Sequence, residues 1–545
     1  MNTILIITLA VLATTARVFG LVGLSILSGW GLGYLAIKSR VFENVYVSVI
    51  EVLESVPVIS FFPVILIFFI ERIGGPLGVE LAADFLVFTA VVWNIWMGIY
   101  QAFKTLPNEI LEVSQNYRLG FLERMRNIYI PFSLPRISAN LFPSLADGFF
   151  YITVSEVISV GTTEYSTFGV GSILQHLTSM NELNYVYIAM LVMGLVIIGV
   201  TLGVREFATY AVSKYTLDTD TPITRRGRPR LRYTVRLSAL ISRSTIQRLS
   251  SYTRRQILGS VRLRRGQVEE ARHTVGHLGW KLLSRLIGIL ILALLVWGII
   301  ATVVSVPASA WVYYLASTPT IVLSMLYDYL RVGIIALVSL GITVTLGYVL
   351  AVNHKAEGVC VPLIQVLFSY PAPLYFPLLF VFTLPIVENV FGPFSAEFYV
   401  IVLGFISTFY YVFFSFWMGV KSIPHEYWEV MRNMGMGFAQ RMRYIIMPAT
   451  FPYIIAGISS TINSAWGGLM LGEYWPGIYG AHTLTVRHGL MKLLDVSTAT
   501  GNLGLAAWAS LLFGFVVAAY SILFTRRMLD LARKRYVVEE GIYAA

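Results

Sequence analysis

The sequence predicts an all-α polytopic membrane protein built from two homologous repeats, each with a helix–turn–helix on its cytoplasmic face. Three observations predict this fold. Apolar residues make up 57% of the 545 residues, charged residues make up only 13%, and several apolar runs exceed the length that spans a bilayer. Two charged stretches far apart in the chain match each other without a gap. When the spans alternate, the basic segments between them fall on one side of the membrane.

The matching stretches begin at Leu106 and Ile423 and read LPNEILEVSQNYRLGFLERMRNIYIPFSLPRI and IPHEYWEVMRNMGMGFAQRMRYIIMPATFPYI. An offset of 317 residues aligns them throughout and also carries Glu156 onto Glu473. Upstream the offset is 314, and it aligns Arg17 with Arg331, Pro57 with Pro371, and Pro63 with Pro377. A repeat of this extent predicts two copies of one structural unit.

The apolar blocks predict about eleven membrane spans, since one crossing needs about 20 residues. These blocks are 3–37, 45–70, 85–103, 136–160, 186–212, 284–306, 320–352, 359–386, 397–419, 453–474 and 503–525. The blocks 3–37 and 320–352 are longer than one crossing, so each predicts either one long helix or a broken pair. The apolar start lacks the basic segment of a signal peptide, and we expect it to be retained as the first membrane helix.

The domain organisation follows from the repeat. Residues 1–213 form the first repeat with about five spans, residues 214–283 a basic linker, and residues 284–545 the second repeat with about six spans. The span 284–306 has no counterpart in the first repeat, and it keeps both charged stretches on one side. We expect the N-terminus outside, and the linker and the C-terminus in the cytoplasm.

Charge and motif content exclude several function classes. Sixteen of the forty Lys and Arg residues lie between Lys214 and Lys281, which is typical of a cytoplasmic connector on anionic lipid rather than of nucleic-acid binding. The chain contains no Gly-Lys dipeptide and hence no phosphate-binding Walker A loop. One cysteine, Cys360, rules out an internal disulfide. We expect no catalytic site, no metal site and no cofactor in this chain.

Each charged stretch predicts a surface helix–turn–helix joined to a membrane span. A proline starts the first helix, acidic residues follow near the positive end of its dipole, a glycine permits the turn, and a short basic helix runs to a second proline. An ordinary polar connection is the alternative, but it would not need the same pattern twice at one offset. The candidate residues are Glu109, Glu112, Gly120, Arg124 and Arg126 in the first repeat, and Glu426, Glu429, Gly437, Arg441 and Arg443 in the second.

These stretches resemble the "EAA" loop of the permease subunits of ABC importers. In both repeats a glycine follows an acidic residue by eight positions, and a proline follows that glycine by eleven. The two alanines of the family pattern are replaced by Val113-Ser114 and Val430-Met431. The resemblance implies an importer in the cell membrane of a prokaryote. Its two loops would dock on two cytoplasmic ATP-binding subunits, which bind ATP and Mg, and an extracytoplasmic solute-binding protein would deliver the solute to it.

The stretch INSAWGGLMLGE, with Trp466 seven residues before Glu473, is similar to the nitrate/sulfonate/taurine branch of these importers. In the first repeat Phe149 stands at the tryptophan position. This resemblance implies a small anion such as nitrate, a sulfonate or bicarbonate, although the same branch also takes up neutral or cationic vitamin precursors.

Several polar residues and prolines within the spans are candidates for the solute pathway or its gate. Arg17 and Arg331 could attract an anion, or could pair with a neighbour such as Asp328. Glu156 and Glu473 should lie at the outer ends of their spans and face the pathway, the binding protein or the interface. The full candidate set is Arg17, Pro57, Pro63, Asp147, Glu156, Arg331, Pro371, Pro377, Trp466 and Glu473. Because Ser464 stands opposite Asp147 in the repeat, any pathway is asymmetric.

Two other functions compete with this interpretation. A secondary transporter driven by an ion gradient would use Glu156 and Glu473 as proton relays. A membrane scaffold without transport would use the duplicated loops as docking surfaces only.

Overall fold

The computed structural model describes residues 3–55, 66–160, 163–180, 182–215, 307–479 and 482–520, together with a few single positions. Pro57, Pro63, the linker beyond Tyr215 and the predicted span 284–306 lie outside the described residues.

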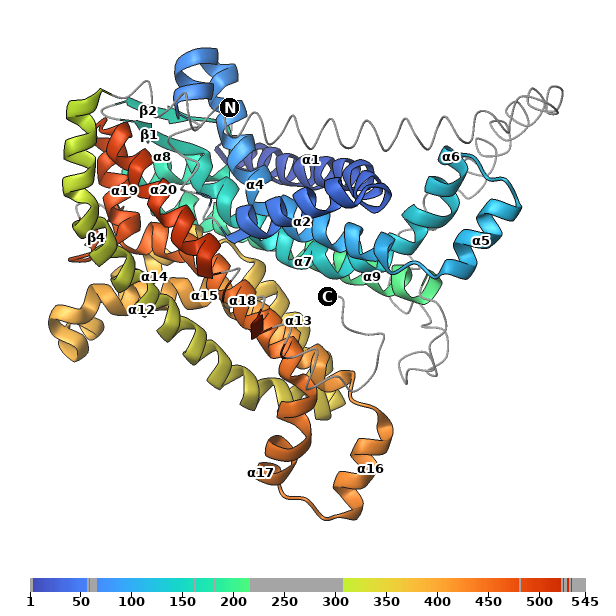
Figure 1. Ribbon diagram of the computed structural model, residues 1–545. Helices are drawn as coiled ribbons and strands as arrows, with labels where there is room; N and C mark the ends of the chain where they lie inside the picture. Colours follow the sequence, from blue (N-terminus) through green and yellow to red (C-terminus); the bar gives the residue numbers. More distant parts are fainter. Residues whose placement is uncertain are drawn as a thin grey trace, which may run out of the picture.

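The two halves have the same order of elements except that η2 of the first half stands where the second half has α14 and η4, and this order confirms the repeat (Figure 1). The first half contains α1 (Thr3–Lys38), α2 (Arg40–Ser55), the π-helical η2 (Leu66–Ile73), α4 (Gly75–Lys104), α5 (Asn108–Asn116), α6 (Phe121–Arg124), the π-helical η3 (Met125–Tyr129), α7 (Ile130–Ser155), β1 (Val157–Val160), β2 (Thr163–Ser166), α8 (Val170–Ser179) and α9 (Leu183–Tyr215). The second contains α12 (Ala308–Val352), α13 (His354–Ser369), α14 (Ala372–Phe391), the 3-10 helix η4 (Gly392–Phe394), α15 (Ser395–Lys421), α16 (His425–Asn433), α17 (Phe438–Arg441), the π-helical η5 (Met442–Ile446), α18 (Met447–Gly472), β3 (Tyr474–Tyr479), β4 (His482–Thr485), α19 (Leu490–Ala499) and α20 (Leu503–Tyr520).

Six helical segments in the described part of the chain are long and apolar enough to cross a membrane. They are Thr3–Lys38, Gly75–Lys104, Leu183–Ala211, Ala308–Val352, Ala372–Lys421 and Phe438–Gly472, and Leu503–Val517 is a shorter apolar helix. The chain is therefore a multi-pass membrane protein, but the predicted count of eleven spans is not confirmed. Both α1 and α12 are single long helices, so the broken-pair alternative was wrong.

The predicted span 359–386 is divided into α13 and α14. Tyr370, with φ −71° and ψ 124°, and Pro371, with φ −60° and ψ 114°, are extended between the two helices. A proline disfavours the helical conformation of the residue before it, which explains the break. The proline therefore ends a helix and does not merely kink one.

The sequence did not predict the β-hairpin that follows the long helix of each half. β1 pairs with β2 and β3 with β4, both antiparallel. Each hairpin lies at the far end of α7 or α18 from the helical hairpins α5–α6 and α16–α17 (Figure 1). The 26 residues of α7 separate the two ends by about 39 Å at 1.5 Å per residue.

Aromatic side chains join the two halves through α7 and α9 on one side and α13 to α15 on the other. The Phe142 ring on α7 meets Tyr410 at 5.7 Å and Phe414 at 5.3 Å, edge to face. The Tyr370 hydroxyl donates to the Met190 carbonyl of α9 at 2.7 Å. These contacts join α7 and α9 of the first half to α13, α14 and α15 of the second half across the interface between the halves.

Within the second half, α15 and α18 pack closely through glycines. A Cβ atom on Gly468 would lie 2.5 Å from the Gly404 Cα atom and 2.7 Å from the Ser407 Oγ atom. A Cβ atom on Gly457 would lie 2.8 Å from the Val412 backbone. Small residues allow membrane helices to approach in this way, because association there depends on close van der Waals contact.

We predict that Gly468→Leu lowers stability by about 1–3 kcal/mol, the usual cost of overpacking, as measured by denaturant unfolding in detergent micelles. The matched control is Gly341→Leu in α12, where an added Cβ atom meets nothing within 4 Å. Equal effects of the two substitutions would contradict the close packing of α15 on α18.

Candidate functional site

The helical hairpins begin as predicted, but their turns are made differently. Pro107 and Pro424 immediately precede α5 and α16. The turn itself uses a left-handed residue, Arg118 with φ 48° in the first half and Gly435 with φ 59° in the second. Gly120, with φ −67°, and Gly437, with φ −70°, have backbone conformations that any residue can adopt. The predicted need for glycine at Gly120 and Gly437 was therefore wrong.

Matching side-chain contacts close both turns. The Arg124 Nε atom donates to the Leu119 carbonyl at 2.8 Å, and the Arg441 Nε atom donates to the Met436 carbonyl at 2.7 Å. The backbone N–H of Gly120 donates to Glu123 at 3.0 Å, and the corresponding N–H in the second half donates to a glutamine at 3.1 Å. Arg124 and Arg441 therefore hold the turn. The other candidate side chains are exposed, namely Glu109, Glu112, Arg126, Glu426, Glu429 and Arg443.

Each hairpin is fixed to its own half by two connections. The Phe121 ring packs edge-on against Tyr34 of α1 at 5.0 Å, and the Phe438 ring packs in the same way against Tyr348 of α12 at 5.3 Å. In addition, α6 runs through η3 into α7 without a break, as α17 runs through η5 into α18. The prediction that the second helix ends at Pro131 was wrong, because a proline in the first turn of α7 needs no N–H partner.

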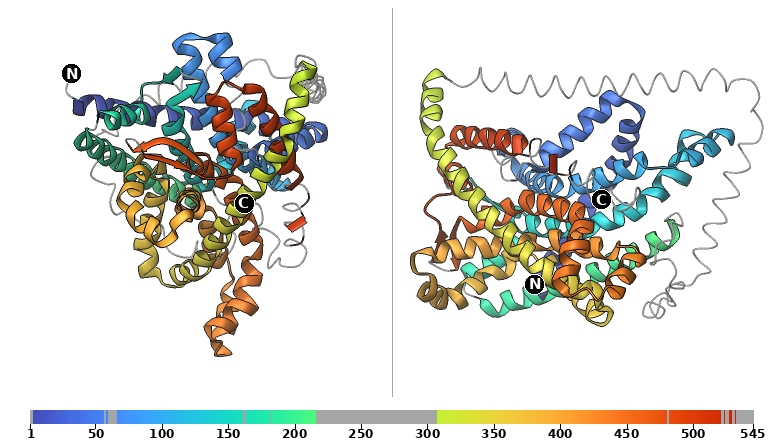
Figure 2. Two further views of the ribbon diagram at one scale, coloured as in Figure 1. Left: turned by 90° about the vertical axis from the view of Figure 1, so that its left-hand side faces the viewer. Right: turned by 60° about the horizontal axis from the view of Figure 1, so that its bottom comes forward.

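Apolar side chains on each hairpin point into solvent. In the first half Val113 is exposed and Tyr117 is 78% exposed; in the second half Val430 is exposed and Met434 is 68% exposed. The members of each pair are four residues apart, so they lie on one face of their helix. The α16–α17 hairpin stands clear of the helical body (Figure 2, left). Exposed apolar groups among charged ones mark a surface that another protein can cover.

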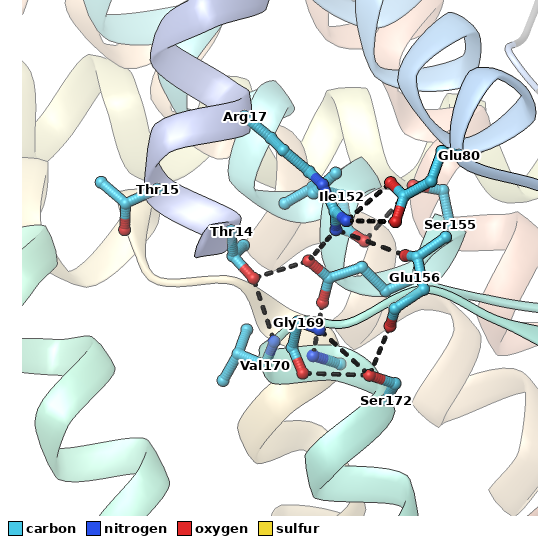
Figure 3. A network of polar contacts seen from close by, with 12 residues as sticks. Thr14, Thr15, Arg17, Glu80, Ile152, Ser155, Glu156, Gly169, Val170 and Ser172 are labelled. Carbon is cyan, nitrogen blue, oxygen red and sulfur yellow. Dashed lines mark hydrogen bonds and ion pairs between the residues drawn. The ribbon is translucent and has the colours of Figure 1, made fainter. Parts of the chain in front are cut away.

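At the other end of the first half, Arg17 joins the buried Glu156 and the partly exposed Glu80 in one polar network (Figure 3). Its guanidinium lies 2.6 Å from Glu80 and 3.5 Å from Glu156. The Thr14 hydroxyl donates to Glu156 at 2.6 Å, and the N–H of Gly171 in the first turn of α8 donates to it at 2.7 Å. Helix N-terminal N–H groups favour an anion at this position.

The second half repeats the network with one more acid. Arg331 makes two hydrogen bonds of 2.7 Å to Glu397 and one of 2.9 Å to Glu473. Asp328, which occupies the repeat position of Thr14, lies 2.8 Å from Arg331 and accepts the N–H of Leu490 at 2.9 Å. The predicted alternative, an ion pair between Arg331 and Asp328, is confirmed.

These networks give four pathway candidates a structural role instead, namely Arg17, Arg331, Glu156 and Glu473. Glu156 and Glu473 are fully buried, so they neither face an open pathway nor project to an interface. A side chain on Gly169 or Gly489 would overlap the carboxylate of the nearby glutamate. The glycines therefore let the helix N-termini reach the acids. Both arginines are neutralised by carboxylates and offer no free charge to an anion.

One further ion pair in each half lies near the helical hairpin. The sequence analysis did not predict these two ion pairs. Lys104, at the end of α4, lies 2.6 Å from Glu43, and Lys421 lies 2.7 Å from Glu357 at the same repeat positions. Burial raises the pKa of Glu43, but hydrogen bonds from Lys104 and Tyr100 outweigh it, so the pKa lies below its ordinary value. Matching opposite charges at the repeat offsets could have revealed these pairs.

The halves meet at Asp147 of α7. The Tyr410 hydroxyl donates to one carboxylate oxygen at 2.9 Å, and the Tyr411 hydroxyl donates to the other. Ser464, the repeat counterpart of Asp147, lies beside it, and both residues line the two cavities described below. The predicted asymmetry therefore lies at the centre of the protein, between the two halves.

Two small cavities flank Asp147 and share Asp147, Tyr151 and Ser464 as lining residues. The cavity on the α4 side, here called the first-half cavity, is also lined by Glu54, Val58, Thr89, Ala90, Trp93, Asn94, Tyr411, Ser460 and Asn463. The cavity on the α13 side, here called the second-half cavity, is also lined by Ala146, Phe150, Phe368, Tyr370, Pro371, Ala372, Ile406, Ser407, Tyr410 and Gly467. The repeat offsets relate many of these positions, so the cavities are counterparts around the central interface.

The remaining pathway candidates divide between the cavities and the core. Pro371 lines the second-half cavity, whereas Pro377 lies within α14. Trp466 is 1% exposed and packs edge-on against Phe513 at 4.6 Å, and its counterpart Phe149 is buried as well. Trp466 is therefore a core residue and lines neither cavity, because its ring packs within a buried cluster of the second half.

The comparisons agree with a duplicated chain. A family model described as "Binding-protein-dependent transport system inner membrane component" matches residues 22–214 and again residues 343–536. No match among curated proteins was found.

We predict that Arg331→Met destabilises the protein by at least about 3 kcal/mol, because it leaves three carboxylates without their shared cation. Asp328→Thr should cost less than about 1 kcal/mol, since threonine occupies this place in the first half. Denaturant unfolding in detergent micelles measures both. A mild Arg331→Met together with a severe Asp328→Thr would contradict the assigned network.

Proposed function

We propose that this chain, which belongs to the family of binding-protein-dependent transport system inner membrane components, forms the whole membrane core of an ATP-driven importer for a small solute. The family model matches twice, so one polypeptide supplies two homologous units. The observation that carries the proposal is the pair of helical hairpins, which repeat the same turn, the same arginine contact and the same exposed apolar pair.

In this proposal each hairpin docks on one cytoplasmic ATP-binding subunit. The exposed acidic and basic side chains would form the rim of the contact, and the exposed apolar pair would form its centre. ATP and Mg would be bound by those subunits. The chain itself is a transport component and not an enzyme.

Movement of the ATP-binding subunits would be transmitted to the centre of the membrane through the helical hairpins and the long helices that they join. Each hairpin contacts the first long helix of its half through a Phe–Tyr pair and continues directly into α7 or α18. The Asp147 contact with Tyr410 and Tyr411 bridges α7 and α15, so separating the halves must break it. Two arrangements of this interface, each favoured by different partners, would provide alternating access.

The opposite end would receive an extracytoplasmic solute-binding protein at the β-hairpins. We expect the N-terminus outside, and the linker and C-terminus in the cytoplasm of a prokaryotic cell, because the distribution of basic residues favours this orientation. Sequence resemblance offers an anion such as nitrate, a sulfonate such as taurine, or bicarbonate as the solute, and also neutral or cationic compounds.

A secondary transporter is less well supported. Its proton relays would be Glu156 and Glu473, which are held by an arginine and by backbone N–H groups and line neither central cavity. A scaffold without transport would not need a carboxylate at the central interface.

We predict that Val430→Arg with Met434→Arg weakens binding of the ATP-binding subunit at least about tenfold, because two charges would be buried at the centre of the contact. The measurement is quantitative co-purification from the native host, with the partner identified by its phosphate-binding sequence. The control is Met180→Arg, at a residue that is 57% exposed at the end of α8. Retained binding in the double variant, or equal loss in the control, would contradict docking at this hairpin.

A further inference from the structure

We propose that the second half holds one proton between Asp328 and Glu473 at neutral pH, at a proton-binding site that the first half lacks. The site lies at the end of the second half that is opposite its helical hairpin, within the network of Arg331. The proposal starts from the difference between the two arginine networks, because the second network contains one acid more than the first.

The second network contains more negative charge than its arginine can neutralise. Glu397, whose side chain is 32% exposed, accepts hydrogen bonds from the Nε and Nη2 atoms of Arg331. Asp328 and Glu473 have fully buried side chains, and both accept a hydrogen bond from the Nη1 atom, at 2.8 and 2.9 Å. Two buried carboxylates that share one nitrogen atom repel each other, so such a pair favours a state in which one proton is retained.

The first half shows which hydrogen bonds are made at the position of Asp328. Thr14 occupies this position, and its hydroxyl accepts the N–H of Val170, the first residue of α8, and donates to Glu156. Asp328 accepts the N–H of Leu490, the first residue of α19, at 2.9 Å. An ionised carboxylate cannot donate a hydrogen bond, whereas a protonated one accepts and donates. A protonated Asp328 therefore reproduces both roles of the threonine hydroxyl.

The groups around the pair offer no second cation among the described side chains. The surrounding charged and titratable residues come from α12, α15, α19 and the loop before α19, and are Tyr327, Arg331, Glu397, His488, Lys492 and Asp495. The Lys492 ammonium group donates to the Val486 carbonyl at 2.6 Å. The His488 ring stacks on Tyr327 at 5.2 Å. Asp495 adds a negative charge that interacts with Glu473.

The remaining neighbours do not change this balance of charge. The elements α20, β1 and β3 also contact α12 or α19, and their sequences contain no Asp, Glu, Lys, Arg or His. Arg331 therefore faces two buried acids, and one retained proton removes the repulsion between them.

The proton would hold three segments of the second half together. Asp328 lies on α12, Glu473 lies at the end of α18, and both accept N–H groups from the first turn of α19. Loss of the proton would leave two ionised carboxylates on one nitrogen atom and weaken this contact. The first half has a hydroxyl in place of the second acid, so its network should not respond to pH in this way. Neither acid lines a central cavity, so the proton is held in place and not carried across the membrane.

Infrared difference spectroscopy tests the proposal, because the carbonyl band of a protonated carboxyl group is separate from the bands of a carboxylate. The full chain is compared with its Asp328→Thr variant in detergent micelles at neutral pH, in water and in heavy water. We expect the difference spectrum to contain the band of one protonated carboxyl group, with a shift in heavy water. The control is Glu388→Gln, at an exposed residue near the end of α14, which should leave this band unchanged.

The pH dependence of unfolding provides a second measurement. Carboxyl groups of the unfolded chain lose their protons near about pH 4. If the folded chain retains one proton above that pH, its stability falls as the pH rises, until the pair ionises. In this range the unfolding equilibrium constant of the unmodified chain should rise about tenfold per pH unit relative to that of Asp328→Thr.

Two results would overturn the proposal: a difference spectrum that contains carboxylate bands alone, or parallel pH dependences of unfolding in the two chains. If Asp328→Thr does not fold, Glu473→Gln replaces it in both comparisons, with the same expected loss of the protonated band. These measurements need no ATP-binding subunit and no solute, so their failure leaves the proposed importer untouched.

Discussion

Each half of this protein depends on one arginine that pairs with at least two carboxylates, Arg17 being partly buried and Arg331 buried. Arg17 and Arg331 join the first long helix of their half to the end of α7 or α18 and to the start of the helix after the β-hairpin. Ionised groups removed from water must be paired or hydrogen-bonded within the protein. The network therefore ties three segments of each half together.

The halves are alike at both ends and differ in the middle. The hairpin turns, the Phe–Tyr contacts, the lysine–glutamate pairs and the arginine networks all recur at the repeat offsets. At the centre, Asp147 faces two tyrosines of α15, while its counterpart is Ser464. Because the two repeats are fused in one chain, each repeat can have its own residue at a given position of the central interface. In the proposed importer, the two similar helical hairpins would each dock on one ATP-binding subunit, and the asymmetric centre would bind one solute.

Sequence patterns predicted the helices and the repeated helical hairpins, but they did not predict the contacts between residues that are far apart in the chain. Prolines, acidic first turns and apolar runs lie within single helices, so the hairpins and several of the long helices could be predicted. The acidic partners of the two arginines could not be predicted, because Glu80 lies 63 residues from Arg17 and Glu397 lies 66 residues from Arg331. The same holds for the contact between Asp147 and Tyr410, 263 residues apart. The short β-hairpins lack a long alternating pattern.

The distance between the two hairpins tests the central claim most directly. Spin labels at Leu122→Cys and Ala439→Cys, two exposed positions related by the repeat, in the Cys360→Ser chain assembled with its ATP-binding subunits, would report this distance by pulsed electron paramagnetic resonance. If the hairpins are the points where ATP binding acts on two rigid halves, the distance shortens when ATP is trapped and returns after hydrolysis. An unchanged distance in the trapped state, with both subunits bound, would contradict the account.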